Sequence, residues 1–208
     1  MIQNDFVTEL TEKILSSLFI PVEASGRHIH LSRDDAKTLF GNNYSFTPVK
    51  DLSQPGQYAC KEKVTLKCSK NAMSGITILG PERSKTQVEI SLTDAVKLGV
   101  KAPVRLSGDV LGSAGGVLEG PKGAVGLSEG IIVAKRHIHC TPEDAQRFCV
   151  SDGELVDVRI FGSRPLILCD TPIRVSEASS TVLHIDYDEA NACGFQTGIY
   201  CMILKKMR

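Results

Sequence analysis

The sequence predicts a mainly β (α+β) protein with two small β-barrel domains, which carry short capping helices, are related by an internal repeat and follow an amphipathic helix. Three observations lead to this fold class. From Pro21 onward, short runs of Val, Ile and Leu are separated by Gly, Pro, Asn and Asp, as in proteins built from many short strands. The tetrapeptide Arg-His-Ile-His occurs at residues 27–30 and again at 136–139, about half a chain apart. The segment before Pro21 has helical periodicity instead.

The N-terminal helix is expected within residues 1–20. Its apolar side chains fall on one helical stripe, with charged residues opposite; they are Ile2, Phe6, Val7, Leu10, Ile14, Leu15 and Leu18. Two interpretations remain open. The helix packs on this chain's own body or on a partner subunit, which would make the protein a homo-oligomer, or it is a detachable targeting helix.

The two barrel halves are expected at residues 21–120 and 121–208, and they are free to exchange strands. Many short strands with few short helices favour barrels over a βαβ sheet. Strands are expected at 63–66, 75–79, 86–90, 104–106, 131–133, 155–158 and 181–184. The glycine-rich segment 115–130 is the expected crossing between the halves, and a site between two domains is a usual place for a ligand pocket.

The repeated tetrapeptide has the form of a metal chelate. Successive side chains of a strand point to opposite faces, so the two histidines of each copy share one face and the isoleucine takes the other. A three-residue pattern, a potential metal ligand followed by an apolar residue and a helix N-cap, occurs at four places in the sequence. The potential ligands, called donors below, are His30, Glu89, His139 and His184. The alternative is a common helix start beside structural histidines, which does not explain a donor in all four copies.

The pattern predicts six ligands, enough for two metal ions that each have three protein ligands and one open position. They are His28, His30, Glu89, His137, His139 and His184. Imidazole with carboxylate favours zinc in a catalytic arrangement. The seven cysteines are odd in number and form no Cys-x-x-Cys pair, so we expect reduced thiols rather than a zinc ribbon or a complete disulfide framework.

Composition excludes several classes of partner. The formal net charge is zero, from 24 basic and 24 acidic residues, so nothing indicates a nucleic-acid binder. No apolar run approaches the roughly 18 residues of a membrane span, and no secretory signal is visible. We therefore expect a soluble, cytoplasmic protein that binds neither nucleic acid nor membranes.

Two basic features are candidates for anion binding. Arg83 lies in a loop six residues before Glu89, and its guanidinium fork matches phosphate or carboxylate, although a solvated surface arginine is the alternative. A basic stretch could hold a phosphorylated cofactor or form a solvated strand face; it contains Lys61, Lys63, Lys67 and Lys70.

From Pro21 to its end, the sequence resembles the PduL-type phosphate propanoyltransferases. The motifs that carry the resemblance lie at residues 22–32 (VEASGRHIHLS), 86–91 (TQVEIS), 102–109 (APVRLSGD), 136–139 (RHIH) and 184–192 (HIDYDEANA). The resemblance implies a phosphotransacylase, which converts propanoyl-CoA or another short acyl-CoA such as acetyl-CoA, with phosphate, into acyl phosphate and CoA. It also implies two β-barrels and a two-zinc site.

Site residues follow from the resemblance by motif. One zinc is expected on His28, His30 and Glu89, and the other on His137, His139 and His184. Arg83 is expected to bind phosphate as the catalytic arginine. The residues implied for coenzyme A are Glu23, Ala24, Ser25, Lys70 and Asn191, although the family usually has a small apolar residue where Glu23 stands.

The expected mechanism uses no side-chain nucleophile, because phosphate and the CoA thiolate are themselves the attacking groups. Zinc has three open roles, as Lewis acid, thiol activator or template. Cys140 is discounted as a nucleophile because strand alternation turns it away from the two histidines. The competing functions are a dinuclear zinc hydrolase and a non-catalytic zinc-stabilised interaction module.

The resemblance adds one more partner. Some relatives carry an amphipathic N-terminal peptide that delivers them into bacterial microcompartments, and residues 1–19 are similar in kind. A microcompartment shell protein is therefore an expected partner, and the microcompartment lumen is the alternative location.

Overall fold

The structure is a computed structural model that describes residues 2–204. It divides into two compact units. Unit 1 contains the chain up to Ala24, Arg136–Ile185 and the chain from Glu189 on, whereas unit 2 contains Ser25–Lys135 and Asp186–Asp188. In the described residues, no helix combines the length and apolar character needed to cross a membrane.

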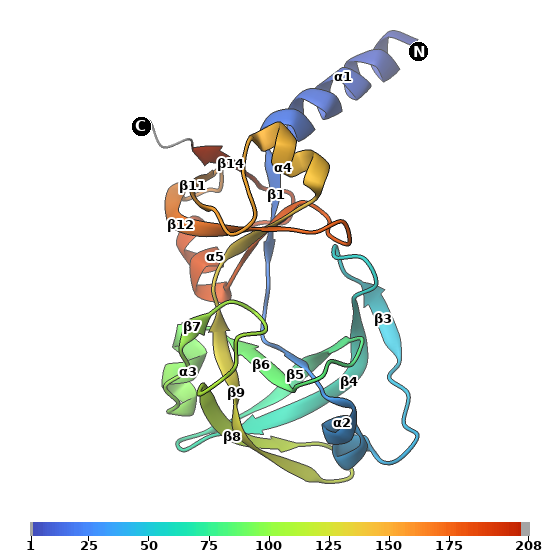
Figure 1. Cartoon of the computed structure of the whole chain (residues 1–208), viewed down its shortest axis with the longest axis vertical. Coiled ribbons are helices and arrows are strands. Elements are labelled where there is room, and N and C mark those ends of the chain that lie inside the picture. Colours follow the sequence, from blue (N-terminus) through green and yellow to red (C-terminus); the bar gives the residue numbers. More distant parts are fainter. Residues whose placement is uncertain (1, 205–208) are drawn as a thin grey trace. The chain divides into compact units, whose positions relative to one another are not determined.

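Unit 2 is a closed barrel of six strands (Figure 1). Around the ring, the strands follow the order β4 (Tyr58–Lys67), β5 (Ala72–Gly80), β2 (His28–His30), β6 (Gln87–Ile90), β9 (Ala124–Ala134) and β8 (Ala114–Glu119), which returns to β4. Two strands extend the ring, β3 (Pro48–Asp51) beside β4 and β7 (Val104–Arg105) beside β9. Two helices follow the donor strands, α2 (Arg33–Phe40) after β2 and α3 (Leu92–Leu98) after β6.

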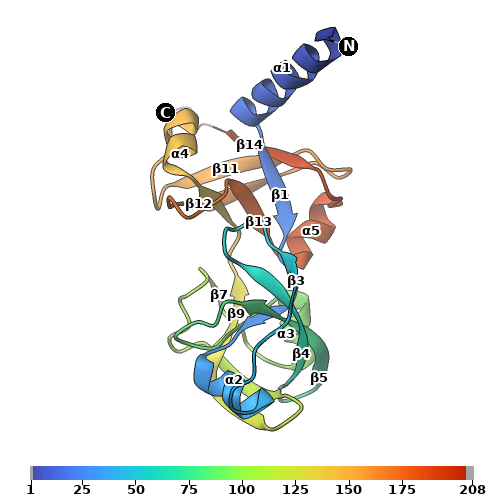
Figure 2. The same ribbon diagram turned by 90° about the vertical axis from the view of Figure 1, so that its right-hand side faces the viewer.

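Unit 1 is a second closed barrel of six strands (Figure 2). Its ring order is β11 (Leu155–Ile160), β12 (Leu166–Val175), β10 (His137–Cys140), β13 (Val182–Ile185), β1 (Ile20–Ala24) and β14 (Tyr200–Leu204), which returns to β11. Its helices are α1 (Ile2–Leu18) before β1, α4 (Pro142–Phe148) after β10 and α5 (Tyr187–Cys193) after β13. The first residues of α5 belong to unit 2. The predicted fold class is confirmed.

The two rings repeat each other strand by strand. The strand that carries each His-Ile-His, β2 in unit 2 or β10 in unit 1, lies between a parallel and an antiparallel neighbour. The parallel neighbours are β5 and β12, and the antiparallel neighbours are β6 and β13. The next strand is again parallel, β9 beside β6 and β1 beside β13. The repeat read from the sequence is therefore a repeat of topology.

The repeat includes an exchange of strands. β1 leads directly into β2, yet it closes the ring that contains β10; β9 leads directly into β10, yet it closes the ring that contains β2. Each strand that precedes an Arg-His-Ile-His motif thus completes the other barrel.

The segment 115–130 is not a linker, so our expectation of a crossing there was wrong. It forms most of the antiparallel pair of β8 and β9, and the turn at residues 120–121 lies inside unit 2. Its glycines serve close packing: a Cβ on Gly115 would lie 2.4 Å from the Leu127 carbonyl oxygen. Every strand range expected from the sequence overlaps a strand of the structure.

The apolar faces of β2 and β10 point into the interiors of their barrels. Ile29 and Ile138 are fully buried, one in each core, and Cys140 is buried beside Ile138. The histidines therefore lie on the outer face of each barrel. Helix caps end the donor segments as expected, since the hydroxyls of Ser32, Ser91 and Thr141 accept hydrogen bonds from the first turns of α2, α3 and α4. All seven cysteines are free thiols.

The helix expected at the N-terminus is α1. The exposed fractions of Val7, Leu10, Ile14 and Leu18 are 56%, 46%, 50% and 51%, so these four side chains of the apolar stripe are exposed, whereas Leu15 is half-buried. Helix α1 contacts α4, and Ile20 already belongs to β1.

Candidate metal centres and their surroundings

The first cluster of ligands forms on β2 and β6 of unit 2. The antiparallel register pairs His28 with Glu89, and His30 follows on the same face of β2. One potential ligand atom from each of these three buried residues lies within 4.8 Å of the other two. Nε2 of His28 is 3.3 Å from Oε2 of Glu89, whereas its Nδ1 lies 2.7 Å from the Gly26 carbonyl oxygen and donates to it. The carbonyl therefore fixes the tautomer that directs a free Nε2 toward the cluster.

A network of hydrogen bonds holds the other oxygen of Glu89. Gln87 Nε2 and Ser107 Oγ donate to Oε1 at 2.5 and 2.8 Å. The amide oxygen of Gln87 accepts from the Gly108 nitrogen at 2.7 Å, which fixes the orientation of that amide. Arg83 Nη1 donates to Ser107 Oγ at 3.3 Å. The carboxylate is thus oriented by two neighbours and linked to the predicted phosphate ligand through one hydroxyl.

Electrostatic interactions couple the protonation of the three side chains of this cluster. Burial lowers the pKa of His28, but the charge and hydrogen bond of Glu89 outweigh burial and raise it overall. Burial raises the pKa of Glu89, but His28 and His30 outweigh it and hold that pKa well below its usual range. The pKa of His30 falls to about 3, first through burial and then through the positive charges of His28 and Arg83. His30 is therefore a neutral imidazole at physiological pH, the form that binds metals.

The second cluster forms on β10 and β13 of unit 1. Nε2 of His137 and Nε2 of His139 lie 3.0 Å apart, and the antiparallel register places His184 opposite His137. The ring centroid of His184 lies 5.4 Å from that of His137 and 5.0 Å from that of His139. Burial first, and then the charges of His137 and His184, lower the pKa of His139 to about 3. One potential ligand nitrogen from each of the three rings lies within 4.8 Å of the other two.

Both clusters fit a zinc ion by the chemistry of their donors. Two imidazoles with a carboxylate, or three imidazoles, are sets found at catalytic zinc sites. In addition, Nδ1 of His30 is buried without a hydrogen-bond partner in residues 2–204, and a buried polar atom of this kind requires an explanation. The structure brings together the same two sets of three that the sequence predicts, and metal binding by them stays a proposal.

Each Arg-His-Ile-His arginine pairs with the helix that follows the third donor of its cluster. Arg27 Nε donates to Asp94 Oδ2 at 2.5 Å, and Arg136 Nη1 donates to Glu189 Oε1 at 2.7 Å. Asp94 and Glu189 each stand five residues after a donor, Glu89 or His184. We did not predict these ion pairs, although their equivalent places in the repeat were visible in the sequence.

The residues expected to bind coenzyme A occupy varied positions. Glu23 and Ala24 end β1, and Ser25 Oγ lies 3.5 Å from His28 Nδ1. Asn191 is an exposed residue of α5. Lys70 is exposed in the turn after β4, and its backbone nitrogen donates to Leu98. Their role in CoA binding stays a prediction.

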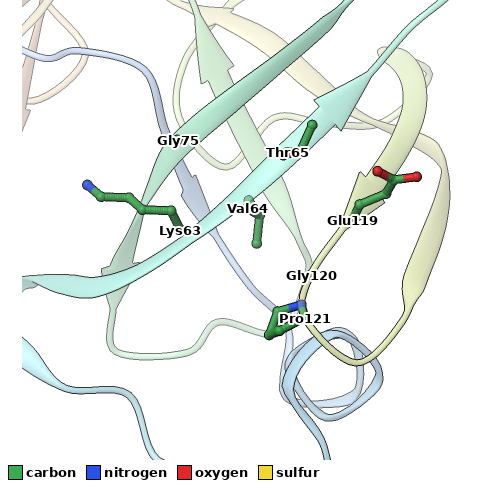
Figure 3. Close-up of a pocket in the computed structure, with 7 residues that line it drawn as sticks. All are labelled: Lys63, Val64, Thr65, Gly75, Glu119, Gly120 and Pro121. Carbon is green, nitrogen blue, oxygen red and sulfur yellow. The ribbon is translucent and has the colours of Figure 1, made fainter.

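One open pocket of unit 2 has a volume of about 380 Å³ (Figure 3). It is lined by Lys63, Val64, Thr65, Gly75, Glu119, Gly120 and Pro121, of which only Lys63 belongs to a predicted anion-binding feature, the basic stretch. Two lysines of the basic stretch have partners here: Lys63 donates to Thr77, and Lys67 pairs with Glu119. On this exposed part of β4, Lys63 is therefore hydrogen-bonded to a neutral hydroxyl and Lys67 is ion-paired.

The sequence matches the family described as phosphate propanoyltransferase over residues 21–196. A phosphate propanoyltransferase of Clostridioides difficile (strain 630) is 52% identical over 203 residues, which cover 98% of this chain and 97% of the relative. One of Sebaldella termitidis is 55% identical over 185 residues, covering 89% and 88%. One of Thermotoga maritima is 49% identical over 193 residues, covering 92% of each chain. The matched range contains every segment that carries the resemblance described above.

Proposed function

Since this chain belongs to the phosphate propanoyltransferase family, we propose that it transfers a propanoyl group between coenzyme A and inorganic phosphate at a site that uses two zinc ions. One ion would bind to His28, His30 and Glu89, and the other to His137, His139 and His184. The observation that carries this proposal is the convergence of these six residues into two sets of three within a chain of this family. Acetyl-CoA is proposed as an alternative substrate.

Arg83 is the group proposed to bind phosphate. Its guanidinium acts electrostatically on both His28 and His30, so it lies close to the first cluster. Its Nη1 donates to Ser107, which in turn donates to Glu89. A phosphate held by this arginine would sit beside the first cluster, where a fork of N–H donors matches two of its oxygens.

The reaction then needs no nucleophile from the protein. A phosphate oxygen attacks the thioester carbonyl, the new C–O bond replaces the C–S bond, and CoA leaves as a thiolate that takes up a proton. When bound, zinc would stabilise the negative charge that develops on the carbonyl oxygen and on the sulfur. The protein's own residues orient the two substrates, and Arg83 holds the attacking group.

The cysteine next to the second cluster does not suit covalent catalysis. Cys140 is fully buried in the core of unit 1, and its pKa is raised, chiefly by burial. A thiol in these surroundings stays protonated and inaccessible to a substrate. The burial of Cys140 therefore supports the proposal of direct transfer to phosphate.

The test is the phosphate-dependent release of free CoA thiol from propanoyl-CoA by the purified chain, before and after zinc is removed and restored. Release that requires both phosphate and zinc would support the proposal. Release without phosphate would support the zinc hydrolase instead. A folded, zinc-loaded protein that releases no thiol would support the interaction module. Acetyl-CoA in the same assay measures the preference for one methylene, which a pocket discriminates by about 10- to 200-fold.

We also propose that α1 binds a partner protein through its exposed apolar side chains. Four such residues, Val7, Leu10, Ile14 and Leu18, are exposed, and exposed apolar side chains on one helix favour a protein contact. A microcompartment shell protein and a second copy of this chain are the two partners that fit. Deletion of residues 1–19 would abolish encapsulation in the first case and change the oligomeric state in the second.

A further inference from the structure

The two clusters differ at one equivalent position. In unit 1, β1 runs parallel to β13, and its register pairs Glu23 with His184. In unit 2, β9 runs parallel to β6, and its register pairs Ile132 with Glu89. His184 and Glu89 are the third donors of their clusters, so Glu23 and Ile132 occupy the same place in the two barrels. The second cluster has a carboxylate where the first has an aliphatic side chain.

The carboxylate of Glu23 reaches the second cluster. Register partners on neighbouring strands point to the same face, and Glu23 Oε2 lies 3.3 Å from Nε2 of His184. The charge of Glu23 also acts on His139, in the direction that raises its pKa. The neighbouring Val22 is buried in the barrel core, which fixes Glu23 on the outer face with the histidines.

Charge gives this placement a chemical meaning. The first cluster offers one carboxylate and two neutral imidazoles, so a bound divalent cation would keep a net charge of about +1. Three imidazoles alone would leave about +2 on the second ion. With Glu23 included, each ion has one carboxylate. In unit 2 it is Glu89 on β6, and in unit 1 it is Glu23 on β1, the strand beside β13.

We propose that Glu23 is a fourth ligand of the metal ion held by His137, His139 and His184. This inference rests on the proposed binding of zinc by the second cluster. The two sites would then differ in kind: the first keeps an open position for substrate, whereas the second has four protein ligands, as structural zinc sites do. This role replaces the contact with coenzyme A that the resemblance implied for Glu23.

Glu23→Gln separates this role from a simpler one. If Glu23 only accepted a hydrogen bond from His184, the amide oxygen of glutamine would still accept it, and the metal would bind almost as before. A ligand role requires the carboxylate charge. The variant should then bind the second ion more than about 100-fold more weakly, which exceeds the 10- to 100-fold that loss of an outer neighbour costs. Glu23→Asp keeps the charge and should bind the ion with intermediate affinity.

The experiment uses the full chain, stripped with a chelator and titrated with Zn²⁺ and with Co²⁺. Glu177→Gln is the matched control, because it removes one exposed carboxylate of the same unit from the segment after β12. Circular dichroism verifies folding, and the visible absorption of bound Co²⁺ reports the coordination number. We expect two ions in the wild type and in Glu177→Gln, and in Glu23→Gln a weakened second site with a changed Co²⁺ spectrum.

Two outcomes would overturn the inference, and they are distinguishable. If the wild type binds two ions and Glu23→Gln binds them with the same affinity and the same Co²⁺ spectrum, Glu23 is not a ligand and the proposed function stands. If the wild type leaves the second cluster empty at saturating Zn²⁺, the two-zinc proposal fails and this inference fails with it.

Discussion

Nε2 of His137 lies 3.0 Å from Nε2 of His139, across the single isoleucine that separates them in the sequence. Two imidazolium rings at this distance would repel each other, so the pair can share one hydrogen or one cation. Burial first, and then the charges of the neighbouring imidazoles, lower the pKa of His139 to about 3. The first prediction follows from this pair.

His139→Ala should remove one of the two expected zinc ions and leave the other. The remaining His137 and His184 provide too few donors for tight binding, whereas the cluster in unit 2 is untouched. Metal analysis of the purified variant should therefore find about one ion per chain instead of about two, and propanoyl transfer should fall by more than about 100-fold. A variant that retained both ions and full activity would contradict the assignment.

Gln87→Leu should weaken the first metal site without removing a ligand. The change deletes the amide that donates to Glu89 Oε1 and accepts from Gly108, so the carboxylate loses its orientation. We expect a 10- to 100-fold loss of affinity for the first ion, measured by competition with a chromophoric chelator. Gln146→Leu, an exposed position on α4, is the matched control and should bind both ions as the wild type does.

Arg83→Lys should raise the KM for phosphate while leaving that for propanoyl-CoA nearly unchanged. Lysine keeps the positive charge but loses the fork of donors that binds two phosphate oxygens. A lost hydrogen bond to a charged group costs about 1.5 to 3 kcal/mol, or roughly 10- to 150-fold. Arg33→Lys, an exposed arginine paired with Glu82, is the control. Equal kinetics in the two variants would show that Arg83 does not bind phosphate.

Arg27→Met should destabilise the protein through the carboxylate that it leaves behind. The Asp94 side chain is 1% exposed, and Arg27, itself 42% exposed, donates to it. An unsatisfied buried acceptor costs about 1 to 3 kcal/mol, and we expect a loss near the middle of that range in urea denaturation. The double variant Arg27→Met/Asp94→Leu removes the buried carboxylate as well and should recover part of the loss. A double variant less stable than Arg27→Met would contradict this explanation.

Asp188 should stabilise the fold at neutral pH and lose this effect in acid. Burial raises its pKa, but hydrogen bonds from Thr93, Ser91 and Leu92 outweigh burial and hold the pKa below the ordinary aspartate value; the Thr93 nitrogen lies 2.8 Å from Oδ2. A carboxyl with a lowered folded-state pKa contributes stability above its unfolded pKa, and the contribution disappears as the pH falls through the folded pKa.

The measurement compares wild type with Asp188→Asn at two pH values. At neutral pH the variant should be less stable by about 1 kcal/mol, typical of a carboxylate near a helix N-terminus. The difference should shrink steadily as the pH is lowered below about 4. A difference independent of pH would mean that the charge of Asp188 contributes nothing.

Local periodicity was sufficient to predict the ligand sets. His28 and His30 share a face because a strand alternates, and the caps at Ser32 and Thr141 mark where each strand must end. The partners of those ligands depend on contacts between distant segments. Ser107 reaches Glu89 from 18 residues away, and nothing near Ser107 in the sequence indicates that contact. The contact of Gln87 with Glu89 was easier to predict from the sequence, because the two residues lie two apart on β6 and therefore share one face of the strand.

The glycines misled the prediction for a physical reason. Gly115 and its neighbours resemble a flexible linker in sequence, but they allow backbones to pack closely in β8 and β9. The sequence does not separate these two uses of glycine, since both depend on the missing Cβ. The exchange of β1 and β9 is equally hidden, because pairing between strands far apart leaves no local signal.

The place of β1 has a consequence for how the protein emerges from the ribosome. All six strands of the unit 2 ring lie between residues 28 and 134, so that barrel can close during synthesis. β1 is made earlier, yet its partners are Leu183 on β13 and Cys201 on β14. β1 can therefore pair with β14 (Tyr200–Leu204) only after residue 204 has been made, and the second barrel cannot close before that point of synthesis.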